Sequence, residues 1–217
     1  MIIQGNIMII HDISMSINPS MTVYKNRDNK RPELINAASF EKEGVFETKL
    51  SMNLHTGTHI DFPLHTIQNG VNSNQYELET FLGIAKVFDL LHVNDHISES
   101  DLLPLDIKEN DFVLFKTKNS ESESFDFEFI YVDLSAAKYL SKKKIRGVGI
   151  DSLGIERNQA NHPTHDTLLS QNIVILEGLR LNNISAKTYD FICLPLKIDA
   201  VEALPVRAIL IENDVNQ

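Results

Sequence analysis

The sequence predicts an α/β protein whose mixed β-sheet is flanked by helices, in one domain spanning residues 1–217. Short apolar runs typical of buried strands recur along the chain, and segments with helical spacing lie between some of them. The predicted strands outnumber the helices without alternating strictly with them, which argues against a barrel. A length of 217 residues suits one domain with a substantial core.

The individual elements follow from these patterns. The apolar runs predict strands at residues 7–10, 45–61, 83–91, 111–116, 147–151, 173–176, 190–196 and 207–211. Helices are expected at residues 77–82, 98–103, 133–144 and 164–171. In the third of these, Leu134, Ala137 and Leu140 repeat at helical spacing, and lysines near its end complement the helix dipole. The polar stretch 18–32 is expected to be a long loop.

Composition limits the partners and the compartment. The net charge of −10 argues against nucleic acid, because a phosphate backbone is bound by an excess of Lys and Arg. The single cysteine, Cys193, lies in an apolar run and is expected to be a buried hydrophobic residue, and a disulfide framework is excluded. No apolar run approaches the roughly 20 residues that a membrane helix needs. The start resembles a first strand more than a signal peptide, so we expect a cytoplasmic protein.

Three of the eight histidines gather in one short segment, His55 to His65. His55 and His59 are four residues apart, but the zincin helix needs Glu after the first His, and this chain has Thr56. On an extended chain, His55, His59, Asp61 and His65 share one parity and would point the same way, with a glycine keeping that face open. Imidazoles with a carboxylate suit a catalytic divalent metal, because they leave positions for water and substrate.

The segment His55-Thr-Gly-Thr-His-Ile-Asp-Phe-Pro-Leu-His65 resembles the His-x-Gly-Thr-His-x-Asp-x-Pro-x-His signature of the cyclase family. This family includes kynurenine formamidases and isatin hydrolases. Further similarity extends over nearly the whole chain, at His11-Asp-Ile-Ser14, Gly149-Ile-Asp151, His165 with Glu177, and Leu194-Pro-Leu-Lys-Ile198. The resemblance implies a swivelling β/β/α, cyclase-like architecture.

The resemblance also implies a set of metal ligands. His55, His59 and Asp61 would bind one ion, and Asp61 would bridge to a second position completed by His165 and Glu177. A helix that starts near His165 and a strand that returns to Glu177 can bring these two side chains together. Zinc or manganese, one or two ions per chain, is expected, because histidine and carboxylate ligands do not choose between the two metals.

Roles for two further residues follow from the same resemblance. His65 would serve as acid/base, since an imidazole pKa lies near neutral pH. Kynurenine formamidases of this type are expected to carry a Trp in the N-terminal loop, followed by Pro-Gly-Asp. This chain has Tyr24 followed by Lys25-Asn-Arg27 there, so Tyr24 is the candidate substrate contact. The loop Ala203-Leu-Pro205 also departs from the family, which tends to have a small glycine-containing turn there.

The remaining candidates receive weaker roles. His162 precedes a proline and a helix start, which favours a loop position, and His92 and His96 are expected to be exposed. His11 is left unassigned. Asp151, at a predicted strand end, could orient a ligand or serve only as a structural hydrogen-bonding group.

Together these features predict a metal-dependent hydrolase that cleaves an amide-type C–N bond through metal-activated water, arylformamidase-like or acting on a cyclic amide. A small-molecule substrate and a homodimer or homotetramer are expected, the latter from the family. One alternative is a polyketide-type cyclase or dehydratase that uses the same metal site. Another is a non-catalytic metal-binding or small-molecule-sensing module, disfavoured because the ligands leave open positions. The sequence leaves the physiological substrate open.

Overall fold

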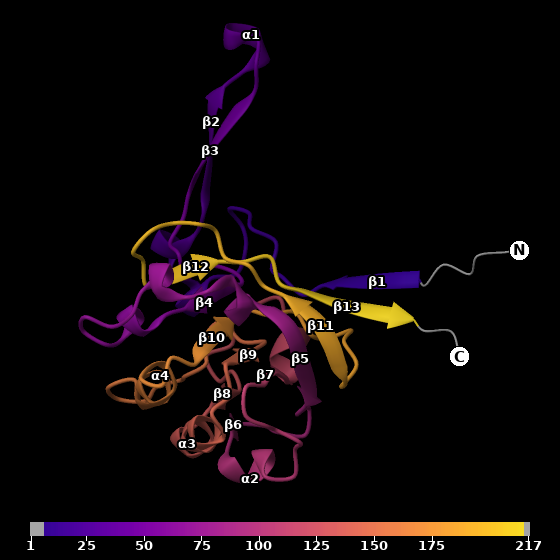
Figure 1. Ribbon diagram of the computed structural model, residues 1–217. Helices are drawn as coiled ribbons and strands as arrows, with labels where there is room; N and C mark the ends of the chain where they lie inside the picture. Colours follow the sequence, from indigo (N-terminus) through magenta and orange to yellow (C-terminus); the bar gives the residue numbers. More distant parts are fainter. Residues whose placement is uncertain (1–6, 215–217) are drawn as a thin grey trace, which may run out of the picture.

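One curled mixed sheet organises residues 7–214, the part of the chain that this computed structural model describes (Figure 1). Its nine strands lie in the order β1-β13-β11-β5-β7-β9-β10-β4-β12. In chain order they are β1 (Ile7–Asp12), β4 (His59–Asp61), β5 (Leu82–Asp89), β7 (Phe112–Lys116), β9 (Gly147–Ile150), β10 (Val174–Glu177), β11 (Thr188–Ile192), β12 (Ala203–Pro205) and β13 (Ile209–Asp214). The central four, from β5 to β10, are parallel, and antiparallel strands extend the sheet on both sides.

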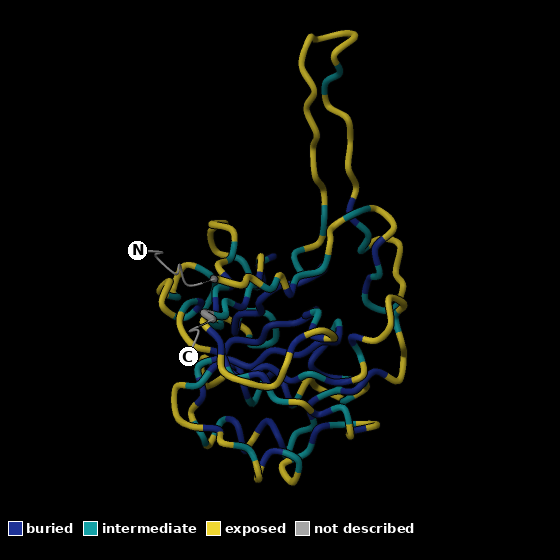
Figure 2. Tube along the Cα trace, turned by 90° about the vertical axis from the view of Figure 1, so that its right-hand side faces the viewer, coloured by how far each residue is buried: buried dark blue, intermediate teal, exposed yellow. Residues whose placement is uncertain are grey.

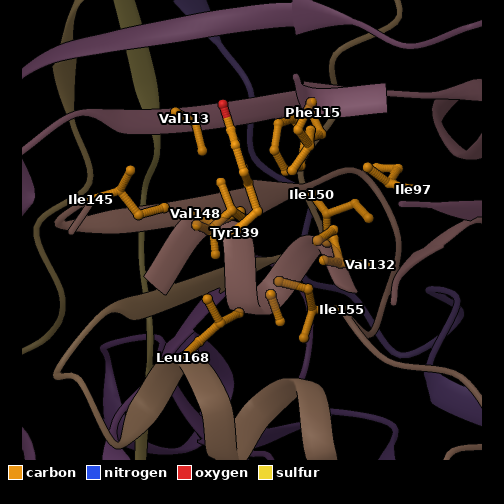
Figure 3. Close-up of a cluster of buried hydrophobic side chains, with 14 of the residues drawn as sticks. Ile97, Val113, Phe115, Val132, Tyr139, Ile145, Val148, Ile150, Ile155 and Leu168 are labelled. Carbon is orange, nitrogen blue, oxygen red and sulfur yellow. The ribbon is translucent and has the colours of Figure 1, made fainter. Parts of the chain in front are cut away.

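The helices cover one face of this sheet. They are α2 (Glu99–Leu102), α3 (Leu134–Lys143) and α4 (Pro163–Leu169). Strand β7 shows how the two faces differ, since Val113 and Phe115 point into the core under the helices. Phe112 and Leu114 point into a second core, which the curled antiparallel strands close. Figure 3 shows the first core, with Tyr139 of α3 and Leu168 of α4 lying over the sheet.

Short elements complete the described chain. The 3-10 helices are η1 (Tyr24–Asn26), η2 (Asp28–Lys30), η3 (Pro63–His65), η4 (Ser73–Gln75), η5 (Leu78–Phe81) and η6 (Lys118–Glu121), and β6 (His96–Ile97) pairs with β8 (Tyr131–Val132). None of the helices in the described part of the chain has the length and apolar character that a membrane crossing requires.

The predicted fold class is confirmed, and most predicted elements occur within a few residues of their expected positions. The expected strand over residues 45–61 is wrong. Strand β3 ends at Ser51, and the chain then turns at Gly57, which has a φ of +72°, before β4 begins at His59. A side chain here would be strained in this left-handed conformation, so the glycine permits the turn and does not keep a strand face open. The parity argument therefore holds only for His59 and Asp61.

A long hairpin projects from the body, and the sequence prediction missed it (Figures 1 and 2). It consists of β2 (Glu33–Ala38), α1 (Phe40–Glu43) and β3 (Glu47–Ser51). Its strand residues are exposed apart from Ala38, which is intermediate. We call residues 33–51 the arm. Strands are predicted from apolar residues that alternate toward a buried face. The strands of the arm face solvent on both sides, so this pattern does not predict them.

Candidate metal centre

The centre begins where β4 and β10 lie side by side as antiparallel strands. Their register pairs His59 with Glu177, and Asp61 with Ile175. Between the two motif residues, Ile60 turns to the opposite face and is fully buried in the second core. Since side chains alternate along a strand, this burial fixes His59 and Asp61 on the other face.

Four buried side chains meet there, and we call them the inner cluster: His59, Asp61, His165 and Glu177. His59 Nε2 lies 3.4 Å from Glu177 Oε2 and 3.4 Å from Asp61 Oδ1. His165 Nε2 lies 3.5 Å from Glu177 Oε1 and 3.9 Å from Asp61 Oδ2. All four are at most 7% exposed. Two strands and helix α4 thus deliver two imidazoles and two carboxylates to one buried cluster, in which ligand atoms of His59, Asp61 and Glu177 all lie within 4.8 Å of one another.

The ring of each histidine is fixed through its other nitrogen. His59 Nδ1 donates a hydrogen bond to the carbonyl of Gly57 at 2.9 Å. His165 Nδ1 donates to Glu156 Oε2 at 3.0 Å, and the same oxygen accepts the backbone N–H groups of Thr164 and His165. Because Nδ1 donates in each ring, Nε2 is the atom that faces the carboxylates, and it can offer a lone pair to an ion that displaces its proton. Metal-binding histidines are typically oriented by such acceptors.

The polar atoms of the inner cluster fit a divalent cation. His59 Nε2 and both carboxylate oxygens of Asp61 are buried without a hydrogen-bond partner among the described residues. Unsatisfied buried polar atoms are costly, and a bound ion would satisfy all three. The donor set of two imidazoles and two carboxylates is one that zinc, manganese and related ions accept.

The pKa values of the four inner-cluster side chains show how strongly they interact when no ion is bound. Burial alone lowers the pKa of His59 and of His165, but the carboxylates beside them outweigh it and raise each to about 10. Burial raises the pKa of Asp61, whereas the imidazoles of His59 and His55 bring it well below its usual range. Burial and the charge of Asp61 raise the pKa of Glu177. His165 and His59 outweigh both effects and lower this pKa to about 2. The centre therefore stabilises positive charge.

Two further histidines, which we call the outer pair, reach the centre from turns. His55 precedes the Gly57 turn, and its Nδ1 lies 2.9 Å from Asp61 Oδ1. Its Nε2 lies 3.5 Å from Oε1 of Glu202, which the sequence prediction missed. His65 ends η3, and its ring centroid is 4.1 Å from that of His55. Asp61 thus connects the other three residues of the inner cluster to the outer pair.

A pocket of about 200 Å³ opens over the centre. Its lining includes the outer pair and two inner-cluster residues, together with Tyr24, Lys30, Leu153, Gly154, Glu156 and His162. Tyr24, the predicted substrate contact, is partly buried there. The pocket gives a small molecule access to the ligand atoms, which a catalytic metal site requires.

The structure brings together the predicted site residues His55, His59, Asp61, His65, His165, Glu177 and Tyr24. His55 and His59, which the resemblance assigns to one ion, both face Oδ1 of Asp61, at 2.9 and 3.4 Å. His59 also faces Glu177 at 3.4 Å. Asp151 has a structural role, since its carboxylate accepts hydrogen bonds from Thr117, Ser120 and Asn119.

Other candidates lie where the sequence suggested. His162 is exposed at the start of α4, and its Nδ1 is 3.9 Å from Glu156 Oε1. Cys193 is fully buried, as expected. The sequence prediction missed Glu156 and Lys30. Each lies outside the longer helices and strands, so the spacing of neighbouring residues does not indicate which part of the structure its side chain faces.

Fold and site together define the class: a mixed α/β protein with a histidine–carboxylate centre for a divalent metal. The chain belongs to the cyclase family, since residues 11–157 match the Cyclase family model. It is 31% identical over 206 residues to a kynurenine formamidase from Salinibacter ruber, which covers 94% of this chain and 97% of that relative.

Solved structures agree with this assignment. One described as a potential metal-dependent hydrolase with cyclase activity is 45% identical and superimposes with a TM-score of 0.90, over 96% of this chain and 100% of the other. Isatin hydrolase A from Labrenzia aggregata is 22% identical with a TM-score of 0.83, over 95% and 94% of the two chains, and this likeness supports the fold.

Proposed function

We propose that this protein is a metal-dependent hydrolase that cleaves the amide-type C–N bond of an arylformamide or a cyclic aryl amide. The observation that carries the proposal is the orientation of His59 and His165, whose Nε2 atoms face two buried carboxylates beneath an open pocket. The similarity to kynurenine formamidases supports the reaction class.

The metal assignment follows from the distances. We assign the first ion, zinc or manganese, to the inner cluster, whose two imidazoles each lie 3.4 to 3.9 Å from both carboxylates. Asp61 faces His55 as well, at 2.9 Å, which supports a bridging role toward a second position. One or two ions per chain are compatible with this arrangement. When bound, such an ion lowers the pKa of water and polarises a carbonyl group.

The residues of the chain handle the protons. Burial lowers the pKa of His65 to about 4, so its imidazole is neutral at pH 7 and able to accept a proton. His65 takes the proton of the attacking water, whose oxygen forms the new bond to the carbonyl carbon. As the C–N bond breaks, the same ring returns the proton to the nitrogen. The products are a carboxylate and an amine, or a ring-opened amino acid when the substrate is cyclic.

The first test is hydrolysis by the metal-loaded protein of N-formylkynurenine, isatin and formanilide, the last being a simple arylformamide. We expect turnover of at least one, abolished by a chelator and restored by zinc or manganese. Enolisation or dehydration of a polyketide-like carbonyl compound, with none of the amides cleaved, would favour the cyclase alternative. That alternative is kept because a similar structure is described with cyclase activity.

The arm supports the proposal of a homodimer or homotetramer. Phe40 is 68% exposed and Phe46 is 58% exposed, and Leu34, Ile35 and Leu50 are each more than 40% exposed. A two-stranded hairpin is marginally stable in water, and contiguous exposed apolar surface usually marks an interface. We therefore propose that the arm packs against another copy of the chain.

Light scattering coupled to gel filtration tests the arm. Replacing Leu34, Phe40 and Phe46 by Ser should shift the mass toward a monomer of 24.6 kDa. The control is Leu103→Ser, which changes a residue of the body that is 61% exposed and should leave the mass unchanged. An unaltered mass in the triple variant would contradict the role of the arm.

We also propose a cytoplasmic location and a small-molecule substrate, without nucleic-acid or membrane partners. The net charge of −10 and the single cysteine, which is buried and free, support this assignment.

A further inference from the structure

Lys30 places a positive charge in the pocket over the metal centre. Among the lining residues in the described part of the chain, Lys30 is the only lysine or arginine. Its Nζ lies 5.6 Å from the centre of the Tyr24 ring and forms no ion pair with a carboxylate of any described residue. A partly buried ammonium group without a counter-ion is costly, unless something that binds there supplies one.

The backbone holds Lys30 at the edge of the site. The residue ends η2, where its N–H donates to the carbonyl of Arg27 at 2.9 Å. Its own carbonyl accepts a hydrogen bond from Thr56 Oγ1 at 3.0 Å, and Thr56 directly follows His55. The position of Lys30 is thus tied to the turn that carries the outer pair.

The carboxylates near Lys30 have other partners. Asp61 and Glu177 face His59 and His165 in the inner cluster, and two positive charges of one bound ion would balance them. Glu156 accepts hydrogen bonds from His165 and from two backbone N–H groups. Burial lowers the pKa of Lys30, and the more distant charges of Glu177 and Asp61 only partly oppose this effect. No carboxylate of residues 7–214 is therefore left to pair with Lys30, and a bound small molecule can supply one.

The Tyr24 ring forms the wall of the pocket beside Lys30, and two phenylalanines that do not line this pocket pack behind it. The Tyr24 ring packs edge-on against Phe125, with centroids 5.3 Å apart, and against Phe129 at 6.3 Å. A Cβ at Gly154 would lie 3.2 Å from the Tyr24 ring, so a glycine keeps this wall close to the pocket. A flat ring fits beside such a wall, with an acidic substituent directed at the lysine.

We propose that Lys30 binds a carboxylate of the substrate, and that the substrates are aryl amides carrying such a group near the scissile C–N bond. This inference rests on the proposed amide hydrolysis. It assigns a specificity-determining role to a residue in the loop where this chain departs from the family pattern. The reaction class that supplies such a substrate is acylation of, or ring closure onto, an aromatic amino acid.

The kinetic test compares two formamides that differ in one charge, 2-formamidobenzoate and formanilide. We expect wild-type protein to favour the charged compound in kcat/KM by about tenfold or more, as one charge-assisted hydrogen bond provides. Lys30→Met should remove most of this preference through KM, with formanilide changed less than about twofold. Lys30→Arg should retain most of it. The matched control is Lys25→Met, because Lys25 Nζ also lies over the Tyr24 ring, at 5.2 Å, but does not line the pocket.

Binding provides a readout without turnover. Anthranilate fluorescence reports its dissociation constant with the metal-loaded and the metal-stripped protein, and we expect Lys30→Met to weaken binding about tenfold in both. Equal affinities for the wild-type protein and Lys30→Met would overturn the role of Lys30. If anthranilate binding depends on Lys30 but neither these formamides nor N-formylkynurenine nor isatin is hydrolysed, amide hydrolysis is wrong and the carboxylate site stands. If both formamides are hydrolysed and Lys30→Met changes neither rate, amide hydrolysis stands and the Lys30 assignment is wrong.

Discussion

The inner cluster and the outer pair each contain two histidines, in different surroundings. The inner cluster comes from two paired strands and a helix, is almost completely buried, and has each histidine fixed through Nδ1. The outer pair comes from turns, and both of its histidines line the pocket, as His165 and Glu177 of the inner cluster do. His55 is 14% exposed at its side chain, whereas Asp61 beside it is fully buried.

This difference suits the two groups to different roles, metal binding and proton transfer. Rigid, dehydrated ligands favour tight binding of an ion, because no side chain must be ordered or moved when the ion enters. An acid/base must exchange protons with water and reach the substrate, which requires access. The contrast therefore assigns metal retention mainly to the inner cluster and proton transfer to His65.

The largest expected effect concerns Asp61. Asp61→Asn keeps the shape of the side chain and removes the charge that both groups share. We expect kcat/KM to fall by more than about a thousandfold, together with loss of bound metal measured by elemental analysis. Glu202→Gln is the matched control, because it removes a carboxylate near His55 and should leave the inner-cluster ion in place. Full metal content in Asp61→Asn would break the assignment.

His65→Ala tests the other side of the comparison. We expect kcat to fall by about 10²- to 10⁴-fold, while the inner cluster keeps its ion. His162→Ala changes an exposed histidine that lines the same pocket and should retain most of the activity. Loss of the inner-cluster ion in His65→Ala would show that His65 is a ligand, and the proposed division would not hold.

Glu156→Gln probes the support of the inner cluster. The amide cannot orient the His165 ring as a charged acceptor does, so we expect metal affinity to fall by about 10- to 100-fold. Competition with a chromophoric chelator measures this change. An unaltered affinity would mean that the contact with Glu156 does not contribute to the site.

The smallest expected effect is on how stability changes with pH. The contribution of the inner cluster falls with rising pH in the metal-free protein, whereas the contribution of bound metal rises. Without metal, the pKa values of His59 and His165 are raised to about 10, above about 6.5 in the unfolded chain. Their contribution to stability is therefore complete below about pH 6.5 and is lost as the pH rises toward 10. Metal must displace these protons, so its affinity rises with pH.

Thermal unfolding with and without chelator measures this effect. The difference in Tm should widen between pH 6 and pH 9, with a stabilisation of roughly 2.7 kcal/mol when free metal is about 100 times its Kd. A difference that narrows with rising pH would contradict protonated histidines in the metal-free inner cluster.

Much of the fold and of the site could be predicted because the signals are local. Helix α3 follows from the spacing of Leu134, Ala137 and Leu140, and strand β7 from one continuous apolar run. The expected strand over residues 45–61 was wrong because β-branched and alternating residues around Gly57 imitate a strand. The turn there depends on a distant neighbour, since a Cβ at Gly178 would lie 2.5 Å from the carbonyl oxygen of Gly57.

By itself, the sequence determined the fold class and the segment His55 to His65, because strand periodicity and a compact motif are encoded in neighbouring residues. It predicted the reaction class through the family resemblance of that motif. Only the tertiary structure decided which ligands face one another. It joined His59 to Glu177 through strand pairing, placed Glu156 behind His165, and left Lys30 unpaired over the pocket. These relations depend on contacts between residues far apart in the chain, which the order of residues alone does not specify.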